Sequence, residues 1–70
     1  MNMEAVKSST IESIGYDGDT KTLRIKFKSG ATYDYADVPY ETHADLMSAP
    51  SIGKHFHSMI RLGPFKHTIV

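Results

Sequence analysis

The feature that most constrains the fold is a stretch in which apolar and polar residues alternate strictly. Leu23, Ile25 and Phe27 are each separated by one polar or charged residue. A β-strand turns successive side chains to opposite faces, whereas a helix would scatter these three around its circumference. Residues 22–28 therefore predict a strand with one face in the core and a basic row, Arg24, Lys26 and Lys28, on the other.

Two further strands are expected beside this one. Residues 11–16 form the first, and Asp17-Gly18-Asp19 reads as the turn after it, because Asp and Gly tolerate the backbone angles of turns. Ser29-Gly30 is a hairpin signal. Tyr33 and Tyr35 then alternate with polar residues and predict a third strand. The result is a three-stranded antiparallel meander.

The length of the hairpin loop decides where both tyrosines point. A two-residue loop places Phe27 opposite Thr32 and puts Tyr33 and Tyr35 on the basic face. A three-residue loop of residues 28–30 places Ile25 opposite Tyr33, and both tyrosines then join the apolar face. Glycine in third place suits the common three-residue hairpin, and register selection favours one consistently apolar face. We therefore favour the three-residue loop.

A first helix is expected to follow the sheet. Val38-Pro39 opens it, because proline is harmless at an early helical position. The helix runs to about Ser48 and buries Leu46 and Met47. Pro50 ends it, since the residue before a proline avoids helical geometry.

A second helix is expected with Ser51 as its N-cap. Its apolar side chains follow helical spacing and form one stripe, comprising Ile52, Phe56, Met59 and Ile60. Gly63-Pro64 ends it. Residues 1–9 read as a flexible lead-in or a short edge segment, and residues 10–70 as a single domain. Phe65 to Val70 is expected to add a short edge strand or to contact a second subunit. The fold class is α+β, with both helices on one face of the sheet.

Size and composition bear on partners and location. A chain of 70 residues without cysteine has a marginal core and no disulfide to support it. We therefore expect self-association, most simply as a two-fold dimer. No apolar run approaches the ~20 residues that span a membrane, and no signal-peptide pattern is visible. The expected location is the cytoplasm.

Charge is balanced overall but not along the chain. Eight basic and eight acidic residues give a net charge of zero, which argues against a strongly basic nucleic-acid binder. After Leu46, however, there is no acid, while Lys54, Arg61, Lys66 and three of the four histidines follow. This segment is either a solvated helix face or an anion-binding face.

The order of motifs resembles the KTSC domain family. The resemblance is carried by Ser8-Ser9-Thr10-Ile11, Ile14-Gly15-Tyr16-Asp17, Leu23-x-Ile25-x-Phe27, Ser29-Gly30, the central Tyr33-Asp34-Tyr35 and Val38-Pro39, and in the second half by Leu46, Ala49, Ser51, Gly53, Phe56 and Ile60. It covers about residues 8 to 61. The family also occurs at the C-terminus of some lysyl-tRNA synthetases, and this association implies RNA binding. Thr42-His43 and His57 depart from the family pattern.

The local candidate for a phosphate site is Ser51-Ile52-Gly53-Lys54. A helix N-terminus offers free N–H groups, glycine permits close approach and lysine adds charge. This is not a P-loop, because the earlier glycine and the following Ser or Thr are missing. The alternative is an ordinary N-cap, with Gly53 giving close packing. Arg61, two helical turns after Lys54, is expected on nearly the same face, and Ser8, Ser9 and His57 are auxiliary candidates.

Tyr33 and Tyr35 either stack on bases or pack in the core. His55 and His57 point in different directions on a helix, so we expect no metal site, and we assign no cofactor. The leading functional hypothesis is a non-enzymatic module that binds phosphates of single-stranded RNA, or of a small nucleotide sequestered in an oligomer pocket. The alternative is a protein-interaction or inhibitor module, like small free-standing proteins of phages and other mobile elements. An enzyme is the third hypothesis, but no positioned nucleophile or acid–base pair is visible.

Overall fold

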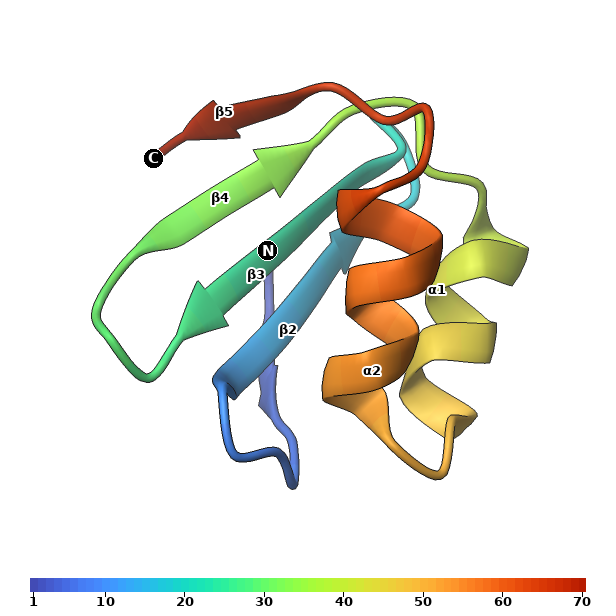
Figure 1. Ribbon diagram of the computed structural model, residues 1–70. Helices are drawn as coiled ribbons and strands as arrows, with labels where there is room; N and C mark the ends of the chain where they lie inside the picture. The colour runs from blue at the N-terminus through green and yellow to red at the C-terminus, as the bar shows by residue number, and fades with distance from the viewer.

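The computed structural model describes residues 1–70 and shows an α+β fold built on one antiparallel sheet of five strands. The strands follow one another across the sheet in chain order (Figure 1). They are β1 (Met3–Ala5), β2 (Ile11–Asp17), β3 (Thr22–Phe27), β4 (Thr32–Tyr35) and β5 (His67–Ile69). Helices α1 (Tyr40–Ser48) and α2 (Ile52–Phe56) lie side by side on one face of it.

The predicted three-stranded meander understates the sheet, because the two edge strands were expected only as alternatives, to a flexible lead-in at the chain start and to a subunit contact at the chain end. The chain start forms β1, in which Met3 pairs with Gly15 of β2. The chain end forms β5, in which Ile69 pairs with Tyr33 of β4 within the same subunit. Each edge strand has three residues, all of them exposed. Segments this short carry no readable period, so their strand character comes from pairing with a neighbour that is already in place.

The three-residue hairpin loop is confirmed. Ile25 pairs with Tyr33, and the N–H of Phe27 donates to the carbonyl of Ala31 at 2.9 Å. Gly30 has a φ of 101°, in the left-handed region where a side chain is strained. Tyr33 and Tyr35 therefore share the helix-facing side of the sheet with Ile25, as one consistently apolar face requires.

The second helix differs from its prediction in geometry. α2 continues without a break into a π-helical segment (His57–Arg61), in which the N–H of Leu62 reaches back five residues to the carbonyl of His57. The wider turn leaves Met59 53% exposed, so its place in the apolar stripe was wrong, whereas Ile60 is fully buried. Ser51 has the extended backbone of an N-cap but makes no side-chain capping bond.

The core lies between the sheet and the two helices. Its fully buried side chains include Leu23 and Ile25 of β3, Leu46 of α1 and Ile60 of the π-helical segment. Leu46 is buried as predicted, while Met47 is only partly buried and packs against the cluster. Partly buried aromatic side chains extend the core toward β4, where the helices leave the sheet less covered.

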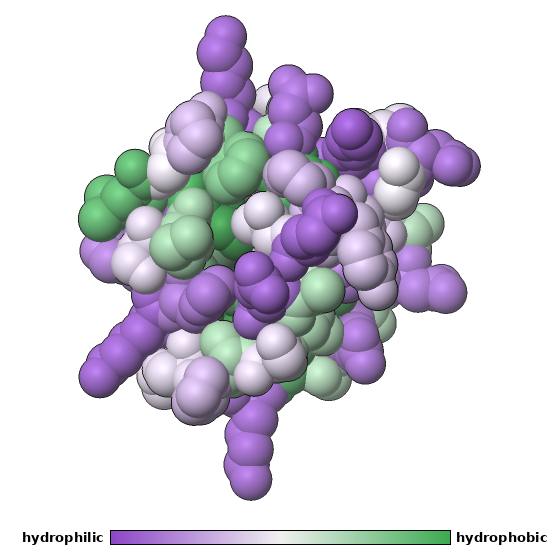
Figure 2. All heavy atoms as spheres, turned by 90° about the vertical axis from the view of Figure 1, so that its right-hand side faces the viewer, coloured by the Kyte–Doolittle hydropathy of each residue, from purple (hydrophilic) through white to green (hydrophobic).

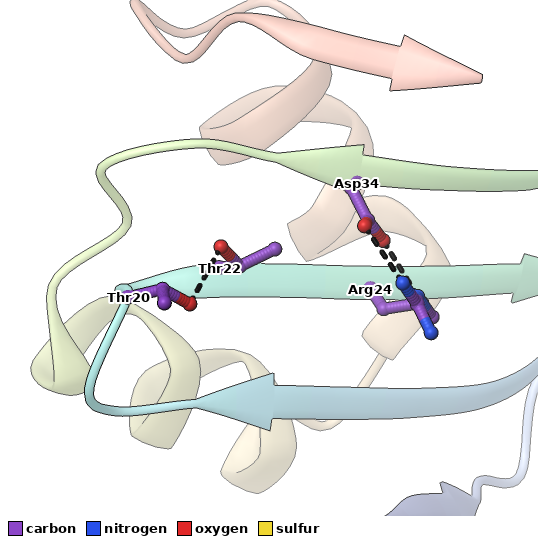
Figure 3. Close-up of polar contacts among 4 residues, drawn as sticks. All are labelled: Thr20, Thr22, Arg24 and Asp34. Carbon is purple, nitrogen blue, oxygen red and sulfur yellow. Dashed lines mark hydrogen bonds and ion pairs between the residues drawn. The ribbon is translucent and has the colours of Figure 1, made fainter. Parts of the chain in front are cut away.

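The opposite face of the sheet is polar. Arg24 of β3 and Asp34 of β4 point toward each other (Figure 3), and the guanidinium donates two hydrogen bonds, of 2.7 and 2.9 Å, to the carboxylate. These contacts raise the pKa of Arg24. Lys26 pairs with Glu12 at 3.2 Å. Two of the three cations in the predicted basic row are thus neutralised, which weakens that row as an anion-binding face.

The helix side of the molecule carries a mixed surface. In Figure 2 its apolar areas are broken up by projecting hydrophilic side chains. None of the helices is both long enough and apolar enough to serve as a transmembrane span.

Candidate functional site

Two hollows bring together the residues that sequence analysis singled out. The first, which we name the serine hollow, has a volume of about 770 Å³. It is lined by residues 7–10 of the loop between β1 and β2, by residues 50–54 at the start of α2, and by His57 and Ser58. The second, which we name the aromatic cup, has a volume of about 420 Å³. It is lined by Phe27, Ser29, Ala31, Tyr33, Tyr35, Phe56, Arg61 and His67.

A serine-anchored turn forms one wall of the serine hollow. Ser8 Oγ accepts hydrogen bonds from the N–H groups of Thr10 and Ile11, both at 3.2 Å. This local bonding bends the chain just before β2 and keeps the hydroxyls of residues 8–10 beside the start of α2. Ile11, the next residue, is fully buried and fixes the turn to the core.

The second wall of the serine hollow is the start of α2. Gly53 in this wall determines how closely the helix approaches the serine-anchored turn. A β-carbon at this position would lie 3.2 Å from Thr10 Oγ1 and 3.3 Å from Ser8 Oγ. Such contacts are tighter than ordinary van der Waals packing, so only glycine leaves the approach free of strain. The packing interpretation of Gly53 is therefore supported, and its packing partner is the loop that carries the auxiliary candidates Ser8 and Ser9.

The lining of the serine hollow is polar and carries cations without acids. Five hydroxyl side chains are present, those of Ser8, Ser9, Thr10, Ser51 and Ser58, together with two lysines and His57. No carboxylate lines it. The hydroxyl of Ser58 already donates to the carbonyl of Lys54 at 3.1 Å. The other hydroxyls can donate to a ligand and the lysines supply charge, so the lining suits an anion with several acceptor oxygens.

The aromatic cup is built at the uncovered end of the helix-facing side. Phe27 contacts Phe56 edge to face at 5.5 Å between ring centroids, and Tyr33 at 5.6 Å. Tyr35 contacts Phe56 at 5.6 Å. Burial raises the pKa of Tyr35, and the positive charge of Arg61 acts against this rise. Arg61 therefore lies within electrostatic reach of the Tyr35 hydroxyl.

The structure does not unite all the predicted site residues. Ser51, Gly53 and Lys54 line the serine hollow with Ser8, Ser9 and His57, but Arg61 lines the aromatic cup with Tyr33 and Tyr35. The prediction that Lys54 and Arg61 share a helix face was wrong. It assumed α-helical rotation over seven residues, whereas Arg61 ends the π-helical segment, which rotates that side chain by a different amount.

Several lining residues were missed by the sequence analysis. Lys7 and Thr10 belong to the serine hollow, and Phe27, Phe56 and His67 belong to the aromatic cup. Lys7 and Thr10 flank the two serines, so their proximity in the chain was an available signal. The phenylalanines were assigned to the core by periodicity, and they do pack on it as well.

Comparison with known proteins relates this chain to a family of small domains. The KTSC domain matches residues 7–63. An uncharacterized protein of Stutzerimonas stutzeri is 39% identical over 61 residues, covering 87% of this chain and 86% of that protein. The crystal structure of a KTSC domain protein from Yersinia pestis superposes with a TM-score of 0.90 at 41% identity, covering 99% and 96% of the two chains.

A longer relative shows the same region inside a larger protein. A lysine–tRNA ligase of Nostoc punctiforme is 43% identical over 60 residues, which cover 86% of this chain but only 10% of the ligase. The match to the family spans both hollows' main walls, from Lys7 to Arg61. The chain belongs to the KTSC domain family.

Proposed function

We propose that this protein is a non-enzymatic binding module for the phosphate groups of a nucleotide or a nucleic acid, and that the serine hollow holds the phosphate. The observation that carries the proposal is the composition of that hollow. Five hydroxyls, two lysines and one histidine converge there, and no carboxylate is among the lining residues.

The residues have distinct roles in this proposal. Lys7 and Lys54 approach from the loop and from α2 and supply positive charge. The hydroxyl of Ser51 makes no capping bond and is free to donate to a phosphate oxygen. Gly53 keeps the two walls at their close spacing. The site needs no metal and no proton transfer, because binding a dianion requires only donors and charge.

A small nucleotide is favoured over a long nucleic acid. Affinity for a polymer draws on many phosphate contacts, whereas the net charge of this chain is zero and two cations of its sheet face are already paired. A single phosphate group needs only a few convergent polar groups. The relatives named lysine–tRNA ligase support RNA as the polymeric alternative. If an oligomer of this chain sequesters the small nucleotide, we expect the nucleotide to bind stoichiometrically and not to be turned over.

Fluorescence anisotropy of a labelled short single-stranded RNA at low salt tests the proposal, with unlabelled mononucleotides, cyclic nucleotides and nucleosides as competitors. We expect Lys54→Gln and Lys7→Gln each to weaken binding about tenfold, since a charge-assisted hydrogen bond contributes about 1.5–3 kcal/mol. Lys66→Gln, an exposed lysine outside both hollows, is the matched control.

Two results would count against the proposal. Equal weakening by all three lysine variants would indicate diffuse electrostatic attraction without a site. Absence of RNA binding at about millimolar protein would exclude the polymer, because even nonspecific contacts register there. Absence of heat in a direct calorimetric titration with a nucleotide would then remove phosphate recognition altogether. Competition by nucleotides but not by nucleosides identifies the phosphate as the recognised group.

A second candidate function is protein interaction, favoured by exposed apolar side chains. Leu62 is 69% exposed, Ile69 73% and Val70 62%. Exposed apolar groups at a sheet edge offer a docking surface. If this candidate is right, Lys54→Ala and Arg61→Ala leave binding of the partner protein unchanged, whereas Ile69→Asp abolishes that binding.

A further inference from the structure

The aromatic cup is separate from the serine hollow and has a different chemistry. Its walls are the rings of Phe27, Tyr33, Tyr35 and Phe56, which meet edge to face rather than stacking. Its volume of about 420 Å³ falls within the range of roughly 300–1,000 Å³ typical of small-molecule sites. Aromatic side chains bury large apolar areas and favour contact with a further ring.

Tyr35 belongs to the cup wall, and its hydroxyl is free to bond a ligand. Only 4% of its surface is exposed, yet its hydroxyl takes part in none of the side-chain hydrogen bonds of the structure. Tyr16 offers the contrast, because its hydroxyl donates to the carbonyl of Val38 at 2.6 Å. The Tyr35 hydroxyl is not among the buried polar atoms that lack a partner, so it reaches solvent and can bond a group that enters the cup.

Positive charge borders the cup without any compensating acid. Arg61 lines it from the end of the π-helical segment, and His67 lines it from β5 at 5.5 Å from the ring of Tyr33. No aspartate or glutamate is among the lining residues. Short π-helical turns are rare and are frequently found at functional sites. Here the turn places Arg61 over the cup instead of beside Lys54.

We propose that the aromatic cup is a second ligand site, which binds a planar aromatic ring carrying an anionic group. The ring lies against Phe27 and Tyr33 in the cup wall. Arg61 pairs with the anion, and the hydroxyl of Tyr35 donates to it or to a polar atom of the ring. This inference does not rest on the proposed phosphate site, because the two hollows share no lining residue.

The test is an NMR titration of the full chain with three matched probes, following backbone amide signals. Indole-3-acetate has both ring and charge, indole-3-acetamide has the ring alone, and cyclohexylacetate has the charge alone. We expect indole-3-acetate to shift the signals of Ala31, Tyr33 and His67 saturably. Each of the other two should bind about tenfold more weakly, since one charge-assisted bond or one ring contact is lost.

Variants separate the contributions of the lining groups. Arg61→Gln should weaken indole-3-acetate about tenfold without affecting the acetamide. Tyr35→Phe, which removes only the hydroxyl, should weaken it severalfold. Lys54→Gln, in the serine hollow, is the control and should leave the affinity unchanged. The amide spectrum of each variant without ligand reports whether the fold is retained.

Three outcomes would overturn the proposal. One is equal binding of all three probes, and another is no saturable binding up to about 5 mM, where even a weak fragment registers. The third is loss of the same signals on raising protein concentration alone, with a matching increase in sedimentation, which would assign the cup to contact between two copies of the chain. A negative result in the phosphate-binding experiment on the serine hollow would not change the outcome of this NMR titration.

Discussion

Gly53 of α2 lies so close to Ser8 of the β1–β2 loop that a β-carbon at position 53 would be 3.3 Å from the serine hydroxyl. This relationship joins two segments 45 positions apart in the sequence. It makes the serine hollow a property of packing between loop and helix, and of neither segment alone.

Gly53→Ala is expected to weaken phosphate binding severalfold while changing stability little. The added methyl group crowds the hydroxyls of Ser8 and Thr10, and the gain in helix propensity of about 1 kcal/mol offsets part of the crowding. Anisotropy and thermal unfolding measure the two effects. Gly18→Ala, outside the hollow and without close neighbours, is the control. Unchanged affinity in Gly53→Ala would exclude the close approach as part of the site.

Gly30→Ala is expected to destabilise the protein by about 1–2 kcal/mol. Its φ of 101° strains any side chain, although no atom lies within 4 Å of the added β-carbon. Gly18 has no positive φ, so Gly18→Ala should be neutral or stabilising by up to about 1 kcal/mol. Urea unfolding of the two variants compares them. Equal stability would show that the hairpin rearranges to absorb the strain.

Ile25→Val tests the core at the central strand of the sheet, β3. Ile25 is fully buried, and loss of one methyl group there costs about 0.5–1.5 kcal/mol. In a domain of this size that lowers Tm by about 4–8 °C per kcal/mol. Ile69→Val makes the same chemical change at a side chain that is 73% exposed and should leave Tm unchanged. Equal shifts in the two variants would contradict the assigned core.

His43 is expected to make stability depend on pH. Its ring stacks on Tyr16 at 4.7 Å, its Nδ1 is buried without a partner, and burial lowers its pKa while Glu4 acts against this. The unfolded chain therefore binds more protons than the folded one once pH falls below about 6.5. The contribution of His43 to stability is fully present above that value. It is lost as the pH falls through the lower pKa of the folded state.

His43→Phe keeps the stacked ring and removes the titration. We expect its Tm to fall less than that of the wild type between about pH 8 and pH 5.5, since protonation of His43 then no longer favours unfolding. Comparison at about pH 8, above both pKa values, isolates the packing effect of the substitution. Parallel Tm curves for the two proteins would show that His43 does not contribute.

The sequence alone predicted the central elements because each carries a repeated local signal. Alternation over Leu23, Ile25 and Phe27 indicated β3 and its buried face. Gly30 in third place of its loop indicated the hairpin register, and this register decided the face on which Tyr33 and Tyr35 lie. Pro39 and Pro50 indicated the bounds of α1 to within one or two residues. The family resemblance is confirmed as well.

The edge strands and the division of the site were decided only by tertiary structure. β1 and β5 are too short to show a period, and they exist because β2 and β4 offer free edges for backbone pairing. The π-helical turn follows the buried Phe56 and contains the buried Ile60, and no local residue pattern specifies it. That turn separates Arg61 from Lys54 and so divides one predicted site into two hollows.

The sequence thus determined the order of elements and the residues that face the core, because helical and strand periods are local properties of the chain. Which polar side chains meet was decided by packing between distant segments. The serine hollow needs the loop at Ser8 to close on Gly53, and the aromatic cup needs β5 to bring His67 beside Tyr33. Both contacts depend on the sheet and helices already being in place.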